Sequence, residues 1–151
     1  MVNATSLGVV SSDRTETPPL GGPFEMVEVE ECVNQAKALP GSLGVSLIDY
    51  ATGLTICSAG RHANEDDDLT GSGTASVVRA VVHSPAFMSV GRPSRLNDIV
   101  ITSSNGHHII HFVQTGFDAR LVLYVWLDPN TGNLALAKRS LRLIARELVA
   151  G

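Results

Sequence analysis

The sequence predicts a single domain of the α/β (α+β) class, with its elements in the order α-β-β-α-β-β-β-α. Three observations lead to this prediction: two hairpin patterns, one strand that is apolar on both faces, and helices with an apolar stripe. The chain has 151 residues, of which 44% are apolar and 17% are charged. It is therefore long enough to bury one core without a disulfide or a structural metal.

The N-terminal region divides into a tail and a helix. Residues 1–22 are rich in Ser, Thr, Gly and Pro, which predicts a flexible tail before a domain that spans 23–151. Apolar residues recur at steps of three and four from Met26 to Ala36. This spacing predicts a helix that stops before Pro40.

Turn residues between apolar runs predict two hairpins. Val45–Asp49 and Leu54–Ser58 flank a short loop that contains Gly53, where a positive φ is needed. Ile99–Ser103 and His108–Gln114 flank an Asn-Gly pair, the strongest short-range hairpin signal.

The C-terminal third predicts a central strand and a long helix. Leu121–Leu127 is apolar on both faces, which is typical of a strand covered on both sides. Asn133–Val149 carries a core stripe, while Leu136 and Leu143 lie on the far side and are expected to be exposed unless the first helix covers them. A row of basic residues on this helix predicts a solvated face, with docking of an acidic partner as the alternative. The row is Lys138, Arg142 and Arg146, with Arg139 beside it.

A second helix is predicted from Leu69 to His83. The acidic residues 66–68 suit its N-terminus, where unpaired N–H groups favour negative charge. Because consecutive acids lack the alternating spacing of a calcium loop, capping is the preferred interpretation. Gly71 and Gly73 are expected to weaken the first turn.

The apolar arc of this second helix is wider than one packing face requires. Arg79 and His83 lie on the side opposite the arc. Two interpretations stay open: a well-buried helix, or a helix that packs on its own sheet along one edge and on a partner subunit along the other. The arc consists of Ala75, Val77, Val78, Val81 and Val82.

Composition excludes several classes of function. The net charge of −4 disfavours a general binder of nucleic acid or of anionic membranes. No apolar run reaches the roughly 20 residues that a membrane span requires, and the N-terminus lacks the features of a signal peptide. Cys32 and Cys57 have no metal-site or disulfide-framework spacing and are predicted to be free thiols in a reducing compartment. We therefore expect a cytoplasmic protein.

No motif in the sequence predicts catalysis, a cofactor or a metal site. The chain has neither the Gly-Lys pair of a phosphate-binding loop nor the G-x-S-x-G of a nucleophile elbow. His107, His108 and His111 form the histidine cluster, but on a strand the first and third share one face while His108 points to the other. Turn and edge-strand positions explain these residues better than a metal does.

Three segments resemble the Roadblock / dynein light chain family, and the resemblance covers residues 24–149. The closest matches are 98–102 before the Asn-Gly turn and 133–135 at the start of the final helix. The link between the second helix and the following strand is longer and stiffer than the family pattern. The three segments are GVSLIDYATGLTICSAG (44–60), LNDIVITSSNGHHIIHFV (96–113) and NLALAKRSLRLIARELV (133–149).

This resemblance implies a five-stranded antiparallel sheet with one helix on one face and the two terminal helices on the other. It also implies a homodimer, or a heterodimer with a paralogous chain, in which the third strands pair edge to edge and the middle helices pack together. Arg79 and His83 are then the candidates for partner binding. The implied dimer residues are Val77, Val78, Val81, Val82, Ile99 and Ile101.

Many members of the family bind small Ras-like GTPases, so the resemblance implies a non-enzymatic dimeric scaffold that regulates such a GTPase. One of the three residues Arg79, Arg92 and Arg95 could also serve as an arginine finger that enters the active site of the GTPase. The sequence gives no preference among the three. The first alternative is a module that senses a small ligand or is purely structural, which predicts a pocket with converging polar groups in the sensing case. The second alternative, an enzyme, rests on the histidine cluster alone.

Overall fold

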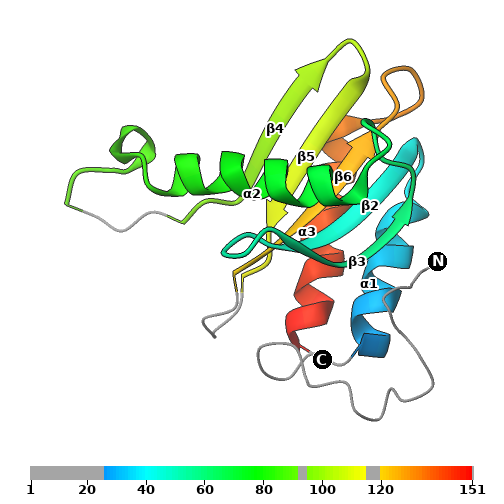
Figure 1. The fold of residues 1–151 in the computed structure, drawn as a ribbon, viewed down its shortest axis with the longest axis horizontal. Coiled ribbons are helices and arrows are strands. Elements are labelled where there is room, and N and C mark those ends of the chain that lie inside the picture. Colours follow the sequence, from blue (N-terminus) through cyan, green and yellow to red (C-terminus); the bar gives the residue numbers. More distant parts are fainter. Residues whose placement is uncertain (1–25, 92–94, 115–119, 151) are drawn as a thin grey trace.

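The computed structural model describes residues 26–91, 95–114 and 120–150, and the predicted tail of residues 1–22 lies outside this part of the chain. Every predicted helix and strand is present in the predicted order (Figure 1). The helices are α1 (Met26–Lys37), α2 (Asp67–Val82) and α3 (Leu134–Ala150), with a short 3₁₀ helix, η2 (Pro85–Phe87). The strands are β2 (Ser42–Asp49), β3 (Leu54–Gly60), β4 (Asp98–Ser103), β5 (Gly106–Phe112) and β6 (Leu121–Leu127).

The strands form one antiparallel sheet in the order β3-β2-β6-β5-β4. Both predicted hairpins are confirmed: β2 pairs with β3, and β4 pairs with β5 from Asp98 opposite His111 to Ser103 opposite Gly106. Strand β6 lies at the centre of the sheet, as its apolar character on both faces predicts.

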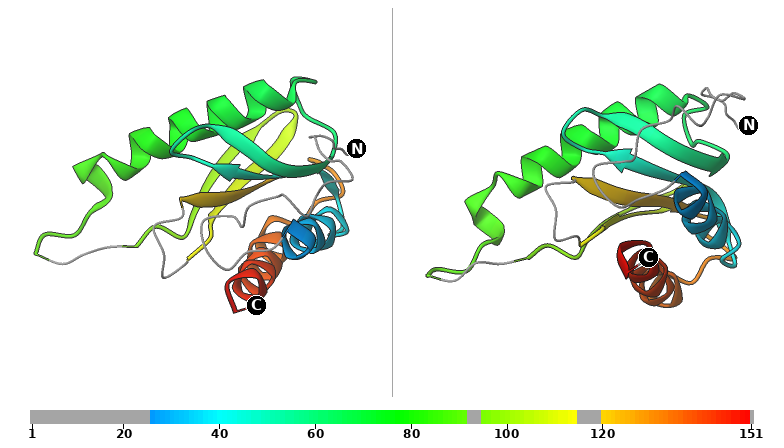
Figure 2. Two further views of the ribbon diagram at one scale, coloured as in Figure 1. Left: turned by 60° about the horizontal axis from the view of Figure 1, so that its bottom comes forward. Right: turned by 90° about the horizontal axis from the view of Figure 1, so that it is seen from below.

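The helices lie on opposite faces of this sheet, which confirms the predicted architecture. Figure 2 shows α1 and α3 side by side beneath the sheet, with α2 on the other face. Side chains of β6 alternate between the two resulting cores. Leu121, Leu123 and Val125 pack toward α1 and α3, whereas Val122 and Tyr124 pack toward α2.

The two terminal helices bury the stripes that their spacing predicts. In α1, Val29 and Ala36 are completely buried. In α3, Leu141 is completely buried, while Leu136 and Leu143 are exposed. Helix α1 packs beside α3 but does not cover these two leucines, so the far side of α3 presents both leucines and cations to solvent. Within the described residues, no helix is both long and apolar enough to cross a membrane.

The two cysteines are free, as predicted. Burial, with a smaller contribution from Cys57, raises the pKa of Cys32 from 9.0 to about 12. Burial, followed by nearby Glu30, raises the pKa of Cys57 from 9.0 to about 11. Because only the thiolate is a good nucleophile, we expect both thiols to react slowly in the folded protein.

We therefore expect Cys57 of the native protein to react with a maleimide at pH 8 roughly 100-fold more slowly than in the urea-unfolded chain, and Cys32 to react more slowly still. The free energy of unfolding should also fall as the pH rises above about 9, because the unfolded chain then loses thiol protons that the folded chain keeps. Mass spectrometry of the labelled protein checks the first expectation. Rapid labelling of native Cys57 would contradict it.

Candidate functional site

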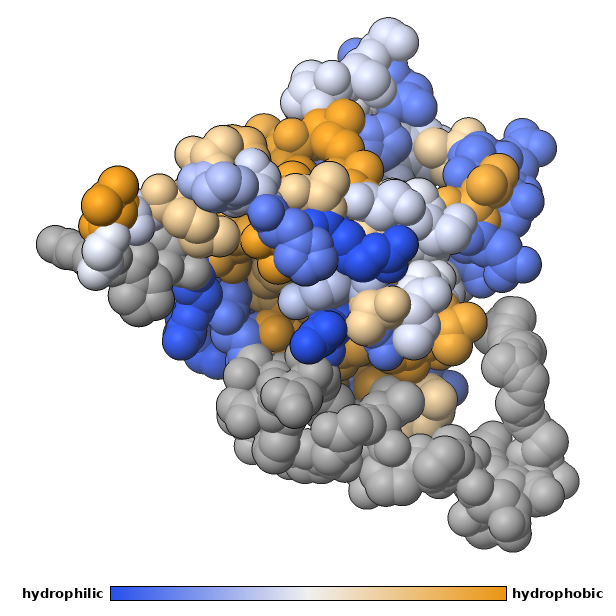
Figure 3. Space-filling model, turned by 60° about the vertical axis from the view of Figure 1, so that its left-hand side comes forward, coloured by the Kyte–Doolittle hydropathy of each residue, from blue (hydrophilic) through white to orange (hydrophobic). Residues whose placement is uncertain are grey.

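An open cleft runs between α2 and the sheet and is the main candidate for a functional surface. We call it the α2 cleft; its volume is about 380 Å³. Helix α2 contributes Leu69, Gly73 and Val77 to its wall. The sheet contributes Ile101 of β4 and Ile110 of β5. Figure 3 shows hydrophobic surface between α2 and the β4–β5 hairpin.

The cleft is open because α2 does not lie centrally over the sheet. The helix makes its main contacts with β2 and β3, and the Ile101 end of β4 stays exposed on this face. Strand β3, at the other edge, is covered by α1 on one face and by α2 on the other. In the described part of the chain, no strand pairs with the outer side of β4. The molecule therefore has an uncovered sheet edge and an uncovered apolar face at the same place, a combination that favours association.

The polar side chains on the floor of the cleft are bonded to one another. His108 lies 2.8 Å from the Tyr124 hydroxyl through Nδ1 and 2.9 Å from Asn105 Oδ1 through Nε2. An amide oxygen only accepts, so Nε2 carries the proton and donates, and Nδ1 accepts from the tyrosine. The His108 ring also stacks at 6.4 Å on Trp126, over which the Arg61 guanidinium lies at 5.5 Å.

This environment favours the neutral form of the His108 imidazole. Burial, followed by the neighbouring His107, lowers the pKa of His108 below 6.5. In the unfolded chain the ring titrates at its ordinary pKa, so the unfolded state takes up the proton first as the pH falls. His108 therefore makes the folded protein less stable below about pH 6.5.

A His108→Gln variant, which can still hydrogen bond but cannot titrate, is expected to lose less stability than the parent between pH 7.5 and pH 5.5. Urea unfolding at both pH values gives the comparison. An identical loss in parent and variant would contradict the lowered pKa of half-buried His108.

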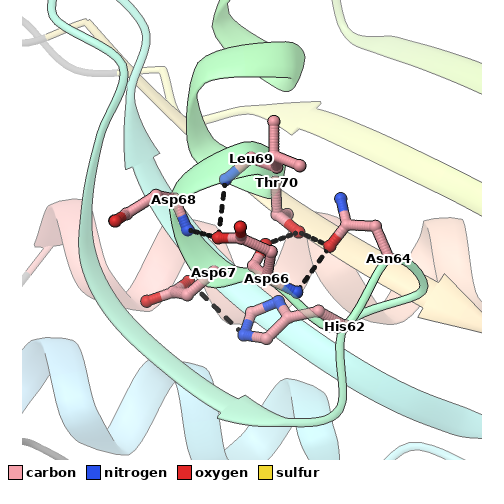
Figure 4. Close-up of polar contacts among 7 residues, drawn as sticks. All are labelled: His62, Asn64, Asp66, Asp67, Asp68, Leu69 and Thr70. Atoms are coloured by element: carbon pink, nitrogen blue, oxygen red, sulfur yellow. Dashed lines mark hydrogen bonds and ion pairs between the residues drawn. The ribbon is translucent and has the colours of Figure 1, made fainter.

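The acidic residues at one end of the cleft are used in capping α2, which confirms the preferred interpretation. Asp66 accepts hydrogen bonds from the backbone N–H groups of Asp68 at 3.0 Å and Leu69 at 3.2 Å (Figure 4). Asn64 accepts from the Asp66 N–H at 2.7 Å, and Asp67 lies 3.4 Å from His62. These contacts fix where α2 begins and therefore where the cleft ends.

The predicted apolar arc of α2 is divided by the structure into two edges. Val78 is completely buried against its own sheet, and Val82 and Ile99 pack against the same core cluster. Val77 and Ile101 instead remain 36% and 42% exposed, and Val81 is half-buried. The interpretation that one edge of the arc packs on the sheet is thus confirmed, and Val78 has no free surface left for a partner. The exposed edge remains available to a second subunit.

Arg79 does not stand free on the opposite side. Its Nη1 atom donates to the Tyr50 carbonyl oxygen at 2.8 Å and so ties α2 to the β2–β3 loop. Together with exposed His83 and Arg120 it lines a second cavity of about 240 Å³. Sequence reasoning misses Arg120 because no pattern links the start of β6 to the end of α2. Of the other arginines considered, Arg95 is exposed and Arg92 lies outside the described residues.

The three clustered histidines are separated by the strand, as predicted. His107 contacts the Thr102 hydroxyl at 3.1 Å, and buried His111 contacts the Asp98 carboxylate at 2.7 Å. Neither shares a partner with His108. Within residues 26–91, 95–114 and 120–150, no three His, Cys, Asp or Glu side chains are placed to hold a metal ion.

Comparison with known proteins identifies the architecture. No protein-family model and no curated protein matches the chain. Among solved structures, MglB from Myxococcus xanthus superimposes with a TM-score of 0.69 at 22% identity, covering 83% of this chain and 88% of that one. The chain has the Roadblock fold.

Two further structures support this assignment. The gliding protein MglB from Thermus thermophilus has a TM-score of 0.56 at 18% identity, covering 84% of this chain and 93% of its own. An MglB with a tetrameric arrangement has a TM-score of 0.56 at 15% identity, covering 87% of this chain and 99% of its own. The predicted resemblance to the Roadblock family is therefore confirmed at the level of the fold.

Proposed function

We propose that this protein is a cytoplasmic, non-enzymatic dimer that binds a small Ras-like GTPase in a signalling complex and modulates its nucleotide cycle. The observation that carries the proposal is the coincidence of the open α2 cleft with the unpaired edge of β4. The Roadblock fold supports the class of partner.

A two-fold axis beside β4 would satisfy both features at once. Antiparallel pairing of two β4 edges joins the two sheets and satisfies backbone groups that otherwise face water. The same axis brings the exposed edges of two α2 helices together over the joined sheet. Val77 and Ile101, which are partly exposed in the single chain, then lose their contact with water.

The cleft suits a protein surface better than a small ligand. A sensor of small molecules needs polar groups that are free to orient its ligand. Here both ring nitrogens of His108 already have partners, and the Asn64 side-chain oxygen accepts a hydrogen bond from the Asp66 N–H. Apart from Thr70, Thr74 and Asn105, the remaining wall is apolar, and the cleft is open. The purely structural alternative differs from our proposal only in lacking the GTPase, and the experiment below separates them.

The second cavity offers a site for acidic side chains of the GTPase. The side chains of Arg79, Arg120 and His83 line it, and none of the described residues in the lining is acidic. Arg79 already donates a hydrogen bond to the Tyr50 carbonyl oxygen. Its side chain is therefore suited to orient a bound partner and not to extend into the nucleotide site of the GTPase. We propose that hydrolysis is modulated by positioning the groups of the GTPase itself.

Two measurements test the proposal. Sedimentation velocity across a concentration series is expected to show a monomer–dimer equilibrium. Capture from a lysate of the source organism, run with GDP and with a non-hydrolysable GTP analogue, is expected to enrich a small GTPase in one nucleotide state. An Arg120→Glu variant should keep the dimer and capture less GTPase. Capture without any GTPase in either state would overturn the regulatory part and leave the structural role.

A further inference from the structure

The connection that follows α2 is unusually apolar for a surface segment. We call residues 84–91 the arm. Phe87 is 60% exposed, Met88 is 37% exposed and Val90 is fully exposed. Scattered single apolar residues on a surface need no explanation, but three within four positions form a patch that favours a partner.

The arm has a defined conformation although its apolar side chains face water. The Ser84 side chain accepts a hydrogen bond from the Ala86 N–H at 3.2 Å and caps η2. The Met88 N–H then donates to the Pro85 carbonyl oxygen at 3.2 Å. The backbone around Phe87 is therefore held in one conformation, which lowers the entropy that a partner contact would cost.

The arm projects beyond the sheet on the β4 side. Figures 1 and 2 show the C-terminal part of α2 and the arm extending past the strands there. Val77 is the last α2 residue that lines the cleft of its own chain. Val78 and Val82 still pack on the sheet of their own chain. The end of α2 and the arm extend into the space that a second sheet, paired at β4, would occupy.

Symmetry then places the arm against a particular part of the second copy. If the two α2 helices run antiparallel about an axis near Val77, residues equally distant from Val77 lie opposite each other. Leu69 precedes Val77 by eight residues, and Pro85, where η2 begins, follows it by eight. Eight residues of helix span about 12 Å. The arm of one chain thus arrives at the Leu69 end of the cleft of the other.

We propose that, in the dimer, Phe87 of each chain inserts into the α2 cleft of the second copy beside Leu69. This inference rests on the proposed dimer and adds the arm as the element that closes the cleft. Leu69 is itself 55% exposed, so both side chains leave water in one contact. The contact is reciprocal, with two arms and two clefts in each dimer.

The cleft is suited to an aromatic ring. Apolar cavities of about 150 Å³ bind molecules the size of benzene, and the α2 cleft measures about 380 Å³. Gly73 has no atom within 4 Å of the position that a Cβ would occupy, so the helix leaves room beside Leu69. Tyr124 and His108 on the floor add aromatic surface for an edge or stacked contact.

The first test compares Phe87→Ser with Val27→Ser by sedimentation at a series of concentrations. Val27 is 68% exposed on α1, on the opposite face, and serves as the matched control. Phe87→Ser is expected to raise the dimer dissociation constant about 10- to 100-fold, because the burial of a phenyl side chain is lost. Val27→Ser should leave it within twofold. An unchanged constant for Phe87→Ser would overturn the role of the arm.

The second test asks whether the arm reaches the other chain. Phe87→Cys in one tagged copy and Leu69→Cys in a differently tagged copy are mixed and mildly oxidised. A disulfide needs Cα atoms within about 7 Å, so a covalent heterodimer reports the proposed contact. Phe87→Cys mixed with Val27→Cys should give none.

The outcomes separate the arm from the dimer. A protein that dimerises with no crosslink between positions 87 and 69 overturns the arm alone. A protein that stays monomeric at every concentration overturns the dimer and the arm together. Equal crosslinking in both mixtures overturns the specific contact, because it shows that the thiol introduced by Phe87→Cys reacts without docking.

Discussion

Substituting Val77→Asp together with Ile101→Lys should produce a monomer at concentrations where the parent is dimeric. Both side chains lie at the exposed margin of the α2 cleft, one on the helix and one on β4. Two-fold pairing would bury two charges of opposite sign from each chain in an apolar contact, and removing them from water costs several kcal/mol even where they pair. We expect the dimer dissociation constant to rise by roughly 1,000-fold or more. Sedimentation equilibrium measures this change.

The matched control is Leu143→Asp, which adds a charge at an equally exposed leucine on α3, on the opposite face. It should leave the association unchanged. A double variant that remains as dimeric as the parent would rule out the surface formed by β4 and α2.

Gly71→Ala should destabilise the fold, although alanine normally favours a helix over glycine by about 1 kcal/mol. A Cβ at Gly71 would lie 2.6 Å from the Gly53 carbonyl oxygen and 2.7 Å from the Thr55 hydroxyl oxygen. Because both neighbours belong to the β2–β3 hairpin, α2 must lift off β3 to make room. Overpacking of this kind costs roughly 1–3 kcal/mol or more, and the effect should appear in urea unfolding.

Gly73→Ala, two residues later, gives the opposite expectation and is the control. Nothing lies within 4 Å of its added methyl group, so only the gain in helix propensity remains, about 0.5–1 kcal/mol of added stability. Both substitutions are best compared in the Val77→Asp, Ile101→Lys background, where association does not contribute. Equal effects of the two alanines would mean that α2 does not rest closely on β3.

These two glycines show where sequence reasoning succeeds and where it stops. The spacing of apolar residues predicts α2 correctly, and propensity alone makes Gly71 and Gly73 equally weak points within it. Their difference depends on Thr55 and Gly53, which approach Gly71 only after the hairpin has folded. The hairpins and β6 are predictable because turn residues and alternation are local signals.

The surface at the α2 cleft cannot be predicted from local sequence patterns. The sequence groups Val77 with Val78, yet one is exposed and the other is buried, because the helix lies toward β2 and β3. The position of a helix across a sheet is set by packing between distant segments. The same limit applies to Arg79, whose bond to the Tyr50 carbonyl joins positions far apart in the chain.

The aromatic stack at the cleft floor gives the protein an intrinsic optical reporter. Trp126 is the single tryptophan of the chain, and its indole N–H donates to the Asn105 carbonyl oxygen at 2.9 Å. Its ring lies between His108, which lines the cleft, and the Arg61 side chain. Whatever enters the cleft alters the polarity around this one fluorophore. Occupancy can therefore be followed by emission wavelength and quenching, without a label, in the same sample used for unfolding.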